Sequence, residues 1–322
     1  MTQSDGLLWG YQLDGEGGGM RFESVPVPSS HERVIWSHWD RNHPNTKRWI
    51  REESGLDPLI SEAMLVEESR PRCLATREGF FAILRGVNLN PGADPEDMVS
   101  VRLWIDPNRI ITLRGPRVMA IQGIANEFDK GTGPRDVGEL LAELTAALIE
   151  RMGPVLDDLN DRVDEMEEQV VSSQKGELRS QLGQLRRTAI TLRRYLSPQR
   201  EVLSRLQTER IEWLSELNRN RIREAMDRLT RYIEDLDAIR ERAAVTQEEL
   251  AGILSEQMNS RMYLLSLVAG IFLPLGLLTG LLGVNVGGIP GTENEWGFVF
   301  VCGLLFVLAL FAAWGLRRWK FF

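Results

Sequence analysis

Cysteine and histidine are scarce in this chain of 322 residues. The two cysteines, Cys73 and Cys302, lie so far apart that they predict neither a disulfide framework nor a thiolate metal site. The three histidines, His31, His38 and His43, all lie in the first strand-rich region. His38 and His43 have no third ligand at a familiar metal-binding spacing. We therefore expect ordinary structural or surface histidines.

An excess of positive charge and a recognisable catalytic motif are also missing. The formal net charge is -8, and no basic stretch is interleaved with aromatic residues, which argues against a nucleic-acid partner. The chain has no HExxH, no phosphate-binding loop and no nucleophile–base pattern, so we expect neither an enzyme nor a cofactor. The first residues, MTQSDGLLWGYQ, have no basic flank followed by an apolar core, so no cleaved signal peptide is expected.

Proline is absent between Pro198 and Pro274, where glycine occurs only at positions 252 and 270. Residues 219–261 carry charges every few positions but keep an apolar seam at alternating intervals of four and three, which is typical of a helix that packs against partner helices. We predict a stalk helix over 219–261 that continues without interruption into the apolar stretch that follows. The seam consists of Ile222, Met226, Leu229, Ile233 and Leu236.

Two apolar stretches near the carboxy-terminal end are long enough to cross a bilayer. Residues 262–282 contain no charged side chain and, as a helix, would span about 30 Å. Residues 296–316 form the second stretch, and the tail 317–322 that follows is basic. The linker 283–295 contains Glu293 and Glu295 but no Lys or Arg, so the positive-inside rule places it outside and both termini in the cytoplasm.

One face of the first span is mostly small or polar, while leucine, isoleucine and phenylalanine occupy the neighbouring positions. Two interpretations fit this stripe. Small residues let helices approach closely, and a water-accessible pore wall needs polar or small side chains. A symmetric bundle around an axis would satisfy both. The stripe consists of Asn259, Met262, Ser266, Ala269, Leu273, Gly276, Gly280 and Gly283.

The part before the stalk divides into two regions. Residues 1–135 alternate short extended and helical runs and predict an α/β domain with a mostly antiparallel or mixed sheet. Strands are expected over 6–13 and 33–39, with hairpins formed by 72–76 with 80–89 and by 99–105 with 109–113. A helical block is expected over 43–65, with a start at Asp57 and Pro58. Residues 136–218 predict a helical hairpin of 137–174 and 178–209, kinked at Pro198, with a turn near 217–219.

The first helix of this hairpin carries a dense run of carboxylates. A solvated helix face is one interpretation, and a negative surface that attracts or senses divalent cations is the other. The residues of the tentative regulatory metal site are Asp157, Asp158, Asp161, Asp164 and Glu165.

The loop after the first span reads GVNVGGIPG from Gly283, and it lies between two spans, beneath a long stalk and before a basic tail. This arrangement resembles the CorA-type family of divalent-cation transporters. The GVN form resembles its ZntB branch of zinc transporters, whereas the magnesium branch has methionine in place of Val284. The segments HWDRNHP, VSVRLWIDPNRIITLR and GTGPR add softer support.

The resemblance implies a funnel-shaped homopentamer in the bacterial inner membrane: an α+β cytoplasmic domain, a long stalk helix and two transmembrane helices, the first of which lines an axial pore. It also implies a ring of Asn285 at the periplasmic mouth and Asn259 near the cytosolic end. Amide oxygens hydrogen-bond the water shell of a dication without stripping it. Glu293 and Glu295 would raise the local cation concentration.

No histidine follows His43, so the pore offers no imidazole, and Cys302 lies on the second span. Zn²⁺ would therefore pass hydrated or with oxygen ligands, and discrimination against Mg²⁺, Co²⁺ and Ni²⁺ should be modest. Zinc transport is the favoured hypothesis. A magnesium, cobalt or nickel channel and a non-transporting membrane-anchored sensor on the same scaffold are the alternatives.

Overall fold

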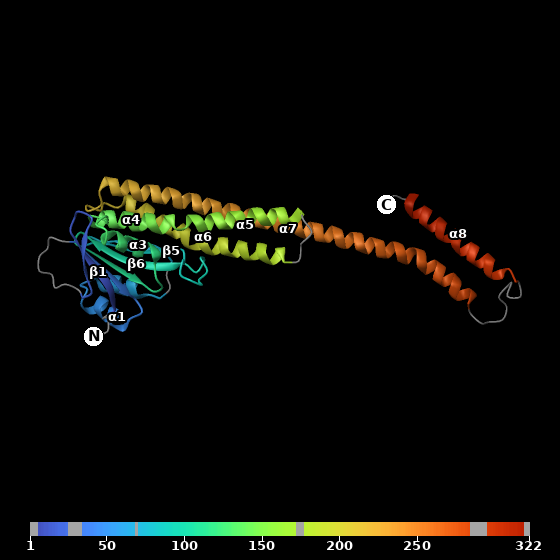
Figure 1. Cartoon of the computed structure of the whole chain (residues 1–322), viewed down its shortest axis with the longest axis horizontal. Helices are drawn as coiled ribbons and strands as arrows, with labels where there is room; N and C mark the ends of the chain where they lie inside the picture. The colour runs from blue at the N-terminus through green and yellow to red at the C-terminus, as the bar shows by residue number, and fades with distance from the viewer. Residues whose placement is uncertain (1–5, 25–33, 68–69, 172–176, 284–294, 319–322) are drawn as a thin grey trace. The chain divides into compact units, whose positions relative to one another are not determined.

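The computed structural model describes residues 6–24, 34–67, 70–171, 177–283 and 295–318. It contains two compact units, Met1–Gln247 and Glu248–Phe322, and each is described by itself below. Figure 1 shows the strands and the helices α1 to α6 of the first unit.

A mixed sheet of seven strands forms the centre of the α/β part, in the order β2-β1-β3-β7-β6-β5-β4. Only the central pair, β3 and β7, is parallel; all other neighbours are antiparallel. Both predicted hairpins are present. The strands are β1 (Leu7–Leu13), β2 (Gly19–Phe22), β3 (Ile35–Asp40), β4 (Arg72–Ala75), β5 (Phe80–Gly86), β6 (Val99–Asp106) and β7 (Arg109–Arg114).

The helices of the predicted helical block, α1 (Pro44–Glu52) and α2 (Pro58–Leu65), cover one face of the sheet. Asp57 caps α2 as expected, since its carboxylate accepts a hydrogen bond from the Leu59 amide at 2.7 Å, and Pro58 opens the helix. Ile50 of α1 and Met64 of α2 are fully buried against Trp39 and Leu113 of the sheet.

A helix that the sequence patterns did not single out, α3 (Met119–Phe128), packs on the opposite face. A register shift in β1 between Leu7 and Trp9 places these two residues on different faces of the sheet, because one extra residue reverses the alternation of side chains. On the α3 side, Tyr11 stacks on Phe128 with 5.1 Å between the ring centroids. The ring centroid of Trp36 on β3 lies 5.8 Å from that of Phe128.

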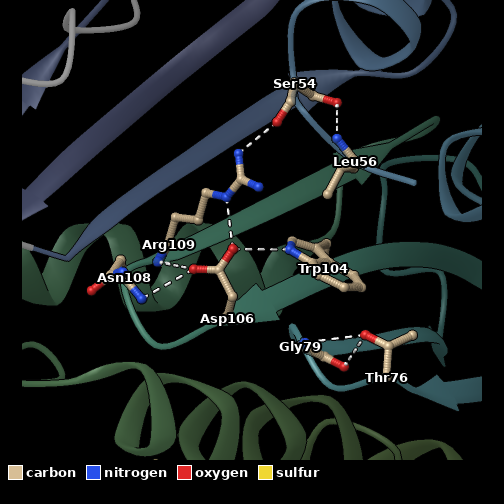
Figure 2. A network of polar contacts seen from close by, with 8 residues as sticks. All are labelled: Ser54, Leu56, Thr76, Gly79, Trp104, Asp106, Asn108 and Arg109. Atoms are coloured by element: carbon tan, nitrogen blue, oxygen red, sulfur yellow. Dashed lines mark hydrogen bonds and ion pairs between the residues drawn. The ribbon is translucent and has the colours of Figure 1, made fainter. Parts of the chain in front are cut away.

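The turn between β6 and β7 is fastened by one carboxylate (Figure 2). Asp106 accepts hydrogen bonds from the Trp104 indole at 3.0 Å, from the backbone amides of Asn108 and Arg109, and from the Arg109 guanidinium at 2.7 Å. Arg109 in turn donates to the backbone carbonyl of Ser54, just after α1. The expected turn thus also ties the sheet to the helices above it.

The helical part differs from the predicted hairpin in its first helix. The first helix is divided into α4 (Val137–Glu150) and α5 (Gly153–Val171), because Pro154 has no N–H to donate to the carbonyl of Glu150. The second, α6 (Leu178–Thr208), has nearly the predicted bounds and contains Pro198, where the kink stays a prediction.

The turn expected near 217–219 lies earlier. The helix α7 (Glu216–Leu282) already begins at Glu216, and Ser215 accepts from the Asn218 amide as its cap. The guanidinium of Arg219 explains the shift, since it donates to the carbonyls of Leu206 and Ile211 and thereby satisfies the end of α6.

The first half of α7 runs beside α5 and α6 (Figure 1). Most of the predicted seam is buried: Ile222, Leu229 and Leu236 are fully enclosed, and Ile233 nearly so. Met226 is only half-buried, and the smaller Ala225 beside it is buried instead. The seam prediction is therefore confirmed for four of its five positions.

Candidate functional site

The second half of α7 is the only helix, among the residues that the structure describes, that is long and apolar enough to cross a membrane by length and composition. The helix passes through Pro274, which cannot donate to the Gly270 carbonyl, and reaches Leu282. The helix α8 (Gly297–Arg318) is also apolar over the described residues Gly297–Ala312. The second membrane span therefore remains a prediction.

The predicted stripe lies along this half of α7 over a length of about 36 Å. All its side chains are exposed in the single chain; 62 % of Met262 and 74 % of Leu273 are accessible. Side chains added at Gly276 and Gly280 would meet no atom of this chain. Within one chain the stripe is therefore uncovered, as are the apolar side chains beside it.

The predicted selectivity loop begins where the helix ends. Gly283 donates its amide hydrogen to the Thr279 carbonyl at 3.0 Å, and the Thr279 hydroxyl donates to carbonyls one turn below. Val284, Asn285 and Glu293 lie outside the described residues, and Glu295 is exposed just before α8. The roles of the loop residues remain predictions.

The acidic run lies on α5, and all five tentative regulatory ligands there are exposed. No group of three or more His, Cys, Asp or Glu side chains in the described part of the chain is arranged to hold a metal ion. The tentative regulatory metal site therefore remains a prediction. The tentative set is Asp157, Asp158, Asp161, Asp164 and Glu165.

One of these carboxylates has another partner. Arg242 of α7 forms a bidentate pair with Glu167 at 2.9 and 2.6 Å and also contacts Asp164. The Glu167 and Asp164 hydrogen bonds raise the pKa of Arg242. Sequence reasoning missed this pair because 75 residues separate Glu167 from its arginine. Two carboxylates of the acidic face therefore join α5 to α7 through Arg242.

Two of the three histidines have structural roles, as predicted. His38 is buried, contacts the Thr112 hydroxyl at 2.9 Å and lies against Trp9. Burial, assisted by the nearby Arg114 charge, lowers the pKa of His38 to about 3. His43 caps α1 by accepting from the Asn45 amide. His31 lies outside the described residues.

Comparison with known proteins gives the same architecture. The family model described as CorA-like Mg²⁺ transporter protein matches residues 31–318. The divalent cation transporter CmaX of Pseudomonas aeruginosa is 39 % identical over 97 % of this chain and 96 % of its own length. The zinc transport protein ZntB of Yersinia pseudotuberculosis is 36 % identical over 99 % of this chain and 97 % of its own length.

Solved structures share the fold. The structure of full-length CmaX superimposes with a TM-score of 0.86 at 39 % identity and covers 98 % of both chains. The CorA magnesium transporter from Methanocaldococcus jannaschii gives a TM-score of 0.82 over 97 % of this chain and 98 % of its own, and at 18 % identity it supports the fold alone. With an α/β part, a long helix carrying an apolar half and a family model matched over most of its length, this chain belongs to the CorA-like Mg²⁺ transporter family.

Proposed function

We propose that this chain is one subunit of a homopentamer that transports a divalent cation, with Zn²⁺ favoured, across the bacterial inner membrane. The observation that carries the proposal is the uncovered stripe on α7, which runs from Asn259 to Gly283 and leads into the GVN sequence. Five such stripes around an axis would line a narrow path, and their small residues would let the helices approach closely.

Zinc is favoured because the chain is 36 % identical to proteins named zinc transport protein and has Val284 in the loop. The CmaX relative, named a divalent cation transporter, supports a broader cargo. Because no histidine and no cysteine lies on the stripe or in the loop, oxygen atoms would select the ion. We expect Mg²⁺, Co²⁺ and Ni²⁺ to compete with Zn²⁺.

The topology that we propose has both termini in the cytoplasm. Residues 262–282 and 296–316 span the membrane, the loop 283–295 is periplasmic, and the basic tail 317–322 is cytoplasmic. In the assembled pore, Asn285 would form the outer polar ring. The carboxylates at positions 293 and 295 would then concentrate cations near it.

The test is zinc flux into liposomes that contain the purified protein and a zinc-sensitive dye. Transport predicts dye response above that of empty liposomes under an ion or pH gradient. Asn285→Ala should lower the flux without loss of the pentamer on size exclusion, and Thr292→Ala in the same loop is the matched control. Flux no greater than in empty liposomes would favour the membrane-anchored sensor instead.

Cargo selection has its own readout. Adding Mg²⁺, Co²⁺ or Ni²⁺ outside the liposomes should reduce zinc entry if oxygen ligands select the ion. If Asn285→Ala forms intact pentamers with normal zinc flux, Asn285 does not take part in ion recognition.

A further inference from the structure

Three arginines meet at one pocket on the α3 side of the sheet, and no carboxylate pairs with any of them in the described part of the chain. Arg21 comes from β2, Arg114 ends β7, and Arg117 lies in the connection to α3. The pocket has a volume of about 290 Å³, with Trp9 and Tyr11 also in its lining. We propose that it binds a small phosphate-bearing anion, with the phosphoryl group held by the three guanidinium groups.

Some arginines of this chain pair with carboxylates at close range, such as Arg51 with Glu62 at 2.7 Å and Arg109 with Asp106 at 2.7 Å. Arg21, Arg114 and Arg117 differ from these in lining one pocket together without such a partner among the described residues. The net charge of -8 means that acidic side chains outnumber basic ones in this chain. Three unpaired guanidinium groups around one pocket therefore leave a local positive charge that an anion would neutralise.

The half-buried Arg114 provides a second, independent observation. Its Nε is shielded from solvent and has no hydrogen-bond partner among the described residues. A buried donor without an acceptor costs free energy, so an acceptor bound in the pocket would stabilise the folded protein. Burial and then the charge of Arg117 lower the pKa of Arg114, and the charge of Asp40 opposes them.

The one carboxylate in the lining, Asp129, is already engaged. It accepts the Tyr11 hydroxyl at 2.9 Å, and burial and Asp129 raise the pKa of Tyr11 to about 12, with Arg21 opposing. Three guanidinium groups and one carboxylate leave a formal charge that matches a dianion. Tyr11 packs on Phe128, so the wall of the pocket is built before any ligand arrives.

The chemistry favours phosphate over a single carboxylate. A guanidinium group presents a planar fork of N–H donors that binds two oxygens at once, and a phosphoryl group offers several oxygens to forks approaching from different elements. The pocket also has room for more than the phosphoryl group. The natural ligand would then be inorganic phosphate, pyrophosphate or a small phosphate ester.

The test is the thermal unfolding of the full-length protein in detergent, titrated with inorganic phosphate and, separately, pyrophosphate. Ionic strength is held constant with NaCl, and a chelator removes metals. We expect the unfolding temperature to rise with anion concentration and to saturate, since a ligand that binds only the folded state stabilises it. A response to pyrophosphate at lower concentration than to phosphate would indicate a ligand larger than the free ion.

Two exposed arginines allow a clean mutational test. Arg21→Gln and Arg117→Gln should each weaken binding by about tenfold, because each removes charge-assisted hydrogen bonds. Arg200→Gln, at an exposed arginine on α6 outside this pocket, is the matched control and should leave binding unchanged. A shift no larger than NaCl alone produces, or equal shifts in the folded Arg21→Gln, Arg117→Gln and Arg200→Gln variants, would overturn the proposal. An acidic segment of a second copy in the pocket would give the first of these results.

Discussion

The carboxyl group of Glu143 should make the stability of this protein fall as pH rises towards neutrality. Glu143 lies on α4 and lines a pocket of about 250 Å³ together with Arg221 and Arg228 of α7. Its Oε2 atom is buried without a hydrogen-bond partner among the described residues. Arg221, whose charge acts on Glu143, pairs with Glu139 at 3.0 Å.

These surroundings determine the direction of the effect. Burial, followed by the charges of Glu127 on α3 and Glu139 on α4, raises the pKa of Glu143 to about 7, and Arg221 opposes them. The folded state therefore holds a proton that the unfolded chain has released at intermediate pH. The stabilisation is complete below the ordinary pKa of about 4.5 and is lost as pH rises through about 7.

The magnitude follows from the pKa difference. At 1.36 kcal/mol per pH unit, the difference is worth about 3 kcal/mol at most. Because the pocket opens to water and neighbouring charges are screened, we expect about 1–2 kcal/mol. Glu143→Gln removes the charge and keeps the shape of the side chain. It should match the native protein near pH 5 and exceed its unfolding temperature by about 2–5 °C at pH 8.

The assay is thermal unfolding followed by the fluorescence of the nine tryptophans, at half-unit steps from pH 5 to pH 8.5 in detergent. Glu150→Gln is the matched control, since Glu150 lines the same pocket but is exposed. A difference between Glu143→Gln and the native protein that stays constant across this range would refute the reasoning, as would the same pH dependence in Glu150→Gln.

Three further changes test other contacts. Asp106→Ala removes the acceptor of four hydrogen bonds. It should lower the free energy of unfolding by about 3 kcal/mol, measured as a lower unfolding temperature. An unchanged unfolding temperature would mean that water replaces the carboxylate. Arg242→Gln should cost only about 1 kcal/mol, since its pair is partly exposed, and a loss undiminished in 1 M NaCl would contradict an ionic origin. In liposomes, Met262→Ser should raise basal zinc leak and Asn259→Leu should lower zinc flux, because an apolar constriction opposes ion passage by dewetting. Unaltered zinc flux in both folded variants would show that this end of the stripe does not line the ion path.

Much of the fold was predictable because the relevant signals are local. The hairpin of β6 and β7 follows from apolar runs on either side of Asp106, Pro107 and Asn108, whose conformational preferences form a turn without help from distant residues. The continuity of α7 from the charged half into the apolar half follows from the absence of proline between Pro198 and Pro274, and its buried seam follows from the helical period. The GVN loop indicated the family for the same reason, since the loop, the apolar stretches on either side of it and the basic tail follow one another in the chain.

Other features depend on contacts between distant residues, which no local pattern encodes. The start of α7 was misplaced because Arg219 reaches back to the carbonyls that end α6. The prediction for the acidic face of α5 was incomplete, because Glu167 pairs with an arginine from another helix. Arg21 on β2 and Arg114 on β7 line the same pocket only because the sheet order places β2 and β7 on either side of β1 and β3. The turn between β6 and β7, the continuity of α7 and the apolar stretch were therefore determined by the sequence itself. Pairing between distant residues, pocket formation and perturbed pKa values arose only when folding brought separate elements together.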